Sequence, residues 1–200
     1  MDSLHPTKRA LVQTVLDQLK TKKPSDLTSE LILETSGISK GSLYHHFEDF
    51  DDLIETAQVF RYAAYVDQSI HLLTKVFQIS KNKEEMVAEL KKVTRFTQSP
   101  DLMPQRMDRA TSISLANANP RMMKKMNVQQ DRLNEAIIDI FREARDRGWI
   151  NPEVDLHAGA LFIQAYTLGI IINDVSGTKI DINAWDELID MFLEKVIATN

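Results

Sequence analysis

The twenty residues 28–47, TSELILETSGISKGSLYHHF, decide the fold that we expect for this chain. Thr28 and Ser39 are good helix N-caps, because their side-chain oxygens accept hydrogen bonds from free backbone N–H groups. Gly37 interrupts the helical pattern between them, since glycine readily adopts the left-handed conformation in which helices often end. The stretch therefore predicts two short helices, one ending near Ser36 and one running to Phe47, joined by a tight turn.

The second of these helices has an apolar face and a polar face. Leu43 and Phe47 share the face that would pack on a core. Lys40 lies in the first turn, where free N–H groups and the helix dipole also attract phosphate. Gly41 removes a side chain and lets the backbone approach a polyanion. The outward face comprises Gly41, Ser42 and His45, flanked by Tyr44 and His46.

The segment Gly37–Phe47 resembles the recognition-helix signature of TetR-family transcriptional regulators. The resemblance extends over about residues 8–60 and includes Thr28 as a cap and Ile32 where the family places an isoleucine. It implies an operator-binding protein in which Tyr44 contacts DNA chiefly through phosphate. The residues that the resemblance places on DNA are Thr28, Ser29, Lys40, Ser42, Tyr44 and His45. A turn of this kind taken alone would equally fit a helical corner that binds nothing.

Several features of the N-terminal fifty residues depart from the family pattern. Leu33 is bulkier than the family's usual residue, and Phe50 stands where the family usually has a phosphate-binding lysine. Residues 1–47 carry six basic and five acidic side chains, and the run from Glu48 to Glu55 is acidic. We therefore expect weak non-specific DNA binding. The same features favour an alternative function, a helical ligand- or protein-binding module with weak or lost operator binding.

Helical periodicity dominates the whole chain, so we predict an all-α fold. A three-helix head, residues 1–50, precedes a larger helical body, residues 51–200. After a first helix that ends before Pro24, and the two helices above, the expected helices cover residues 50–79, 84–96, 104–118, 119–147, 156–175 and 182–198.

By the family resemblance, the body forms a homodimer that presents two heads to a palindromic operator. The apolar helices 156–175 and 182–198 are the best candidates for the dimer interface, because their apolar residues recur at helical spacing. These candidate interface residues are Leu161, Leu168, Ile172, Leu188, Phe192 and Val196.

The body also carries apolar side chains with isolated polar groups among them, as small-molecule sites do. We expect an amphiphilic or aromatic effector, held by some of Phe96, Met103, Met107, Phe162, Gln164, Tyr166 and Asn173. Methionine adapts to ligands of uneven shape, but the same residues could simply fill a core. Ligand-released repression is the commonest mode in the resembled family; activation stays open.

The composition argues against several other classes of protein. The chain has no cysteine, so thiol chemistry and disulfides are excluded. His45 and His46 are adjacent on a helix and cannot share one metal ion. No set of residues forms a catalytic constellation, so we expect neither an enzyme nor a cofactor. The N-terminus lacks an apolar signal segment and no run of eighteen apolar residues occurs, which predicts a cytoplasmic protein that crosses no membrane.

Overall fold

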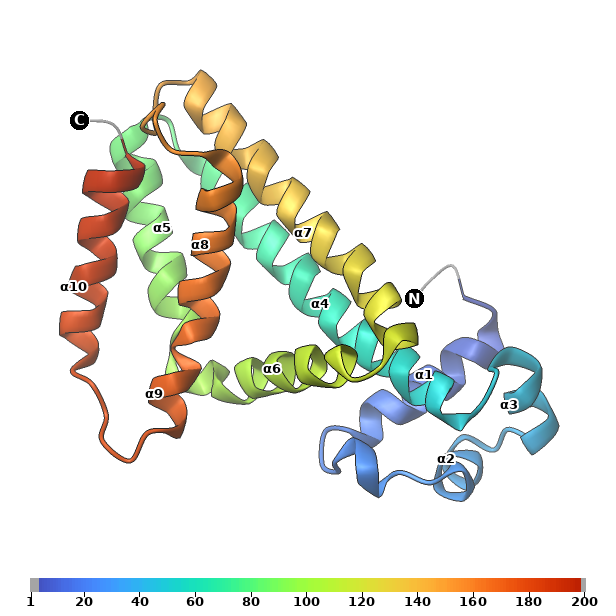
Figure 1. Cartoon of the computed structure of the whole chain (residues 1–200). Coiled ribbons are helices and arrows are strands. Elements are labelled where there is room, and N and C mark those ends of the chain that lie inside the picture. The colour runs from blue at the N-terminus through green and yellow to red at the C-terminus, as the bar shows by residue number, and fades with distance from the viewer. Residues whose placement is uncertain (1–3, 199–200) are drawn as a thin grey trace. The chain divides into compact units, whose positions relative to one another are not determined.

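The computed structural model describes residues 4–198, and α-helices dominate that part of the chain (Figure 1). The all-α prediction is confirmed. The helices are α1 (Pro6–Gln18), α2 (Ser29–Ser36), α3 (Lys40–His46), α4 (Phe50–Ile79), α5 (Lys83–Thr97), α6 (Met103–Asn117), α7 (Pro120–Asp146), α8 (Leu156–Gly169), α9 (Ile171–Val175) and α10 (Ile182–Phe192).

The chain divides into two compact units. The first comprises the described residues up to Tyr65 together with Ser114–Gln129, and the second comprises residues 66–113 and 130–198. Three helices, α4, α6 and α7, run from one unit into the other. The first unit is therefore larger than the head expected from the sequence, because it includes 16 residues of α4, four of α6 and ten of α7.

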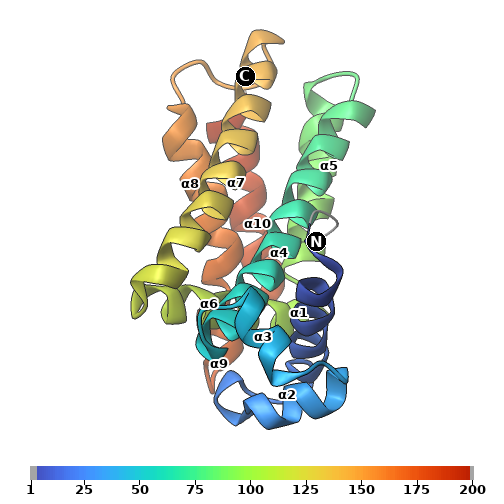
Figure 2. The same cartoon turned by 90° about the vertical axis from the view of Figure 1, so that its right-hand side faces the viewer.

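The core of the first unit lies where α1, α2, α3 and the start of α4 meet. Figure 2 shows α1 alongside α3, with α2 across the end of both. The buried residues are Leu11, Val12, Val15, Leu19, Leu27, Ile32, Leu43, Phe47, Leu53 and Ala57. Pairs such as Val12 and Val15, Leu43 and Phe47, and Leu53 and Ala57 are three or four residues apart, which is the spacing that places side chains on one helical face.

The second unit contains α5, α8 and α10 side by side (Figures 1 and 2). Phe162 of α8 stacks on Phe192 of α10, with ring centroids 4.1 Å apart. Arg95 of α5 donates two hydrogen bonds, of 2.8 and 2.7 Å, to Asp190 of α10. Thr94 of α5 and Tyr166 of α8 share a hydrogen bond of 3.0 Å. Ring stacking and ion pairs thus join the three helices.

The expected helix over residues 156–175 is broken in the structure. α8 ends at Gly169, a poor helix former, and α9 begins at Ile171. Asp174 of α9 is held by the guanidinium of Arg106 through hydrogen bonds of 2.8 and 2.9 Å, which fixes the short helix. By length and composition alone the segment Leu156–Val175 could cross a bilayer, which the sequence analysis did not predict; 28% of an 18-residue window within it is buried.

The last expected helix also changes its winding near its end. α10 stops at Phe192, and Leu193–Ile197 form a wider π-helical turn. The backbone N–H of Asn151 donates to the carbonyl of Ile197 at 2.8 Å, and Ile150 pairs with Ala198 in an isolated antiparallel bridge. Pairing with this neighbouring loop replaces the helical hydrogen bonds of the last turn.

Candidate nucleic-acid interface

Local capping fixes both helices of the candidate interface. The hydroxyl of Thr28 accepts a hydrogen bond from the N–H of Leu31 at 3.2 Å, and that of Ser39 accepts from the N–H of Ser42 at 3.2 Å. Gly37 ends α2 with φ +68°, in the left-handed region that favours glycine. The caps and the turn predicted from the sequence are therefore present, and together they form a helix-turn-helix.

The two faces of α3 separate as the sequence indicates. Leu43 and Phe47 are 0% and 2% exposed, so they anchor the helix in the core of the first unit. Tyr44 is 46% exposed although it is a large aromatic residue. A Cβ built on Gly41 would meet no atom within 4 Å, so the backbone there is open to a ligand. The residues of the predicted interface that are exposed are Thr28, Lys40, Gly41, Tyr44 and His45, while Ser29 and Ser42 are half-buried.

Histidine rings cluster at the end of α3. The ring of His46 lies 4.7 Å from that of His5 and 5.0 Å from that of His45, measured between centroids. Burial lowers the pKa of His46, and the neighbouring His5, His45 and Lys8 lower it further. The ammonium of Lys8 lies 4.6 Å from the ring centroid of Phe47. The pKa of His46 is therefore lowered beside other potential cations at the end of α3.

Phe50 and Leu33, the two departures from the family pattern, have a structural role. Both are partly buried and pack against the core of the first unit. At this position, an apolar contact with the core thus replaces the lysine expected from the family pattern. A substitution of Phe50 would change core packing as well as charge.

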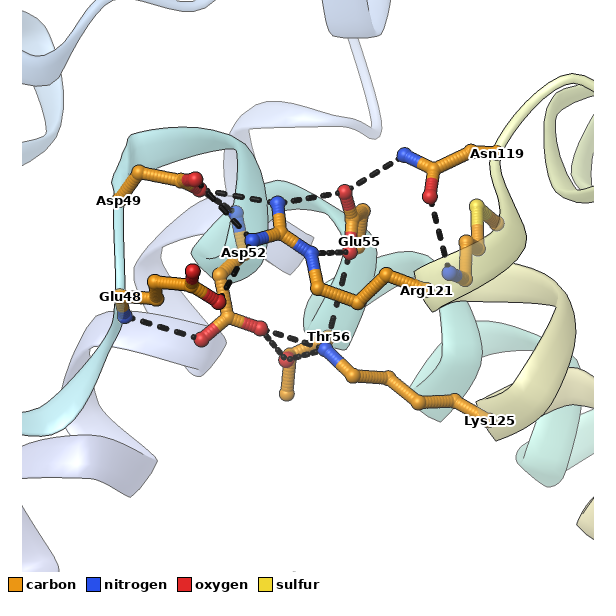
Figure 3. Close-up of polar contacts among 9 residues, drawn as sticks. Glu48, Asp49, Asp52, Glu55, Thr56, Asn119, Arg121 and Lys125 are labelled. Atoms are coloured by element: carbon orange, nitrogen blue, oxygen red, sulfur yellow. Dashed lines mark hydrogen bonds and ion pairs between the residues drawn. The ribbon is translucent and has the colours of Figure 1, made fainter.

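The acidic run after α3 faces cations rather than solvent alone (Figure 3). Arg121 and Lys125, at the start of α7, bind Glu48, Asp49, Asp52 and Glu55. The sequence analysis missed both cations, because they lie more than sixty residues further along the chain. The acid that seemed to oppose DNA binding is thereby partly neutralised within the first unit.

Two of the residues expected to bind an effector are in contact. The rings of Phe162 and Tyr166 lie 5.6 Å apart between centroids. Burial raises the pKa of Tyr166, against a smaller opposite effect of its hydrogen bond with Thr94. Phe96, Met103 and Phe162 are exposed, and Met107 is half-buried.

The amide groups in the same set have protein partners. Gln164 donates to Asn134 at 2.9 Å and to the carbonyl of Ala160 at 3.1 Å, and it accepts from Gln130 at 2.7 Å. Asn173 accepts a hydrogen bond of 2.9 Å from the N–H of Ile180. Both amides therefore stabilise the second unit itself.

Unlike Gln164 and Asn173, Gln58 has an amide without a hydrogen-bond partner, and the sequence analysis did not single it out. It is fully buried on α4, and neither its amide oxygen nor its amide nitrogen has a hydrogen-bond partner. A buried polar group left unpaired costs about 1–3 kcal/mol. Periodicity could not have marked this residue, because glutamine is common on exposed helical faces.

The residues predicted at the dimer interface, which we call the apolar surface of α8–α10, lie on α8, α9 and α10 and, for Val196, in the π-helical turn after α10. Leu161, Ile172 and Leu188 are 68%, 74% and 53% exposed, and Val196 is exposed as well. Leu168 and Phe192 are half-buried. Val175 of α9 and Met191 of α10 are also exposed apolar residues. So large an apolar exposure on neighbouring helices marks a surface that a partner would cover.

No family model matches the chain, and no curated protein matches it in sequence. Solved structures do match its fold. A TetR-family transcriptional regulator from Cytophaga hutchinsonii has a TM-score of 0.69 at 15% identity, over 99% of this chain and 100% of that chain. Escherichia coli NemR in its reduced form has a TM-score of 0.67 at 17% identity, over 96% and 98% of the two chains.

A third solved structure extends the comparison to another regulator. The fatty acid degradation regulator FadR from Bacillus halodurans has a TM-score of 0.63 at 14% identity, over 96% of both chains. All three comparisons cover nearly the full length of both proteins. The chain therefore has the fold of TetR-family transcriptional regulators.

Proposed function

We propose that this protein is a ligand-responsive transcriptional regulator that binds a palindromic operator through α3. One observation carries the proposal: the exposed face of α3 is polar, open at Gly41 and bordered by Tyr44, while Leu43 and Phe47 hold the helix in the core. The fold shared with solved regulators supports it, and so does the pairing of the acidic run with Arg121 and Lys125.

Selection from a pool of random DNA duplexes, followed by gel shifts on the selected sequence, tests this proposal. We expect an inverted repeat with half-sites one or two helical turns apart, because each head of a dimer reads one major groove. The double variant Lys40→Ala/Tyr44→Ala should lose binding. The control Lys22→Ala/Lys23→Ala changes two exposed lysines outside α2 and α3 and should bind nearly as well as the wild type. Recovery of no sequence by the wild type would favour the alternative of a helical binding module.

We further propose that the apolar surface of α8–α10 is the dimer interface. A second copy of the chain is the occupant best suited to it, since an isologous contact lets the same apolar residues meet each other across a twofold axis. Dimerisation would also bring two heads to one operator, which α3 alone cannot do.

The proposed effector is a small amphiphilic or aromatic molecule whose binding releases the operator. Because Gln164 and Asn173 already have partners, the unpaired amide of Gln58, which lies in the first unit, is a separate candidate for binding the polar end of such a ligand. A ligand with both a hydrogen-bond donor and an acceptor would satisfy both atoms of its amide.

The variant Gln58→Leu tests this contact. It removes the unpaired amide, so the free energy of unfolding should stay unchanged or rise. Thermal-shift screening of small amphiphiles should find stabilising compounds for the wild type and none for the variant. A clear loss of stability in Gln58→Leu would instead show that the amide has a structural role, and Gln130→Leu, which removes a paired amide, provides that comparison.

A further inference from the structure

The side chain of Arg121 is surrounded by three carboxylates (Figure 3). Its Nε and Nη2 donate to Glu55 at 2.7 and 2.8 Å, and its Nη1 and Nη2 donate to Asp49 at 3.0 Å each. Nη1 also donates to Glu48 at 3.1 Å. A guanidinium has five N–H groups, and these five bonds use all of them. Lysine could not reproduce this planar, paired arrangement.

Lys125 and Asn119 complete the Arg121 cluster, which we define as Glu48, Asp49, Asp52, Glu55, Asn119, Arg121 and Lys125. Lys125 donates to Asp52 at 2.5 Å and to the hydroxyl of Thr56 at 3.1 Å. Asn119 donates to Glu55 at 2.7 Å and accepts from the N–H of Met122 at 3.1 Å. Glu55 is only 5% exposed, so this carboxylate depends on its partners.

The same carboxylates shape the first turn of α4. Asp49 accepts a hydrogen bond of 2.6 Å from the N–H of Asp52, and Asp52 accepts one of 3.2 Å from the N–H of Glu48. Phe47, the last core residue of the recognition helix, immediately precedes this turn. Arg121 therefore forms hydrogen bonds with residues that directly follow α3.

α7 connects this cluster to a second polar network. It is one helix of 27 residues, about 40 Å long at 1.5 Å per residue. Within the second unit, Gln130 and Asn134 of α7 hydrogen-bond to the buried Gln164 of α8. The cluster and these amides therefore lie on one continuous hydrogen-bonded helix.

We propose that Arg121 is a positioning residue that couples α7 to the recognition helix. This route would act in addition to α4, and its regulatory meaning rests on the proposed function. Removing Arg121 should leave α3 folded but free to adopt several positions relative to α7. Operator affinity should then fall by about 2- to 30-fold, the range produced by changes in coupling networks.

Distance measurements within one chain test this proposal without DNA or effector. The protein has no cysteine, so spin labels at Glu34→Cys on α2 and Val128→Cys on α7 report one distance within the first unit. Dilution with unlabelled protein suppresses distances between copies. We expect a single narrow distribution in the otherwise wild-type protein and a broad one in Arg121→Met. Arg132→Met is the matched control, because it removes another ion-paired arginine of α7, whose partner is the exposed Asp67.

A second variant separates positioning from stability. Arg121→Met leaves Glu55 buried with fewer partners and so lowers the free energy of unfolding, whereas Arg121→Met/Glu55→Gln removes that charge. The double variant should regain stability and keep the broad distribution. A narrow distribution in either variant, or equal broadening in Arg132→Met, would overturn the proposal. Failure of the wild type to bind any duplex would refute the proposed function and leave the distance result standing.

Discussion

Helices α1–α3 bury most of their large apolar side chains, whereas helices α8–α10 expose several of theirs. In α1–α3, as far as the structure describes them, Tyr44 is the one exposed large hydrophobic side chain. In α8–α10, Leu161, Ile172, Val175 and Leu188 are all more than half exposed. The first region buries its apolar side chains in a core shared with the start of α4 and presents a polar face, whereas the second presents apolar side chains that its own chain does not cover. Of the two regions, only the second leaves several large apolar side chains exposed.

Buried polar groups differ between the regions as well. The described part of α1–α3 buries apolar residues, whereas the second unit buries Arg106, Gln98 and Gln164. A polar group inside a protein is stable only while its partners stay in place. The described part of α1–α3 thus depends on no buried polar side chain, whereas the second unit depends on several.

A charge on the exposed apolar surface should have the largest effect. Leu188→Glu should convert dimers to monomers, which sedimentation velocity measures. Operator affinity should fall by about 100- to 10,000-fold, because the second head no longer binds as part of the same molecule. Ile79→Glu, a similarly exposed position outside α8–α10, should stay dimeric. A Leu188→Glu dimer would refute the contrast between the two regions.

Breaking a buried ion pair in the second unit should cost nearly as much. The side chains of Arg106 and Asp174 are 7% and 10% exposed, so Asp174→Asn leaves a buried charge poorly compensated. We expect the free energy of unfolding in urea to fall by about 3–5 kcal/mol. Asp67→Asn breaks the exposed pair with Arg132 and should cost about 0–1 kcal/mol. Equal losses would mean that burial does not set the strength of these pairs.

Substitutions on the exposed face of α3 should change DNA binding and spare stability. Tyr44→Ala should weaken binding to all duplexes alike, because a phosphate contact carries no sequence information. His45→Ala should alter the preference at particular base pairs by about 1–3 kcal/mol. Competition assays with operator variants distinguish the two outcomes, and a change in melting temperature in either variant would contradict the assignment of these side chains to the outer face.

The smallest expected effect concerns pH. Burial and nearby cations lower the pKa of His46 below its ordinary value of 6.5, so the folded protein binds this proton less readily than the unfolded chain does. The free energy of unfolding should therefore fall as the pH drops from above 6.5 toward the lowered pKa. His46→Gln should lessen that fall, whereas His157→Gln, on the second unit, should not. Urea unfolding at pH 7.5 and at more acidic pH measures both.

Local sequence was sufficient to predict the helix-turn-helix. Thr28, Gly37 and Ser39 fix the helix ends through caps and a left-handed turn, which involve residues at most four positions apart. The fourth helix was predicted with its observed ends, Phe50 and Ile79. In the second unit, the break at Ile170 and the π-helical turn after Phe192 were not predicted; beside them, Arg106 binds Asp174 and Ile150 pairs with Ala198, which are contacts between residues far apart in the sequence.

The sequence by itself determined the all-α class, the register of α3 and the division of its residues between core and surface, because each follows from capping and helical spacing. Tertiary structure decided what the charges and amides do. The acidic run is paired because α7 brings Arg121 to it across more than sixty residues, and Gln164 is satisfied because Gln130 and Asn134 meet it from α7. Such pairings depend on which helices pack together, and no local pattern encodes that.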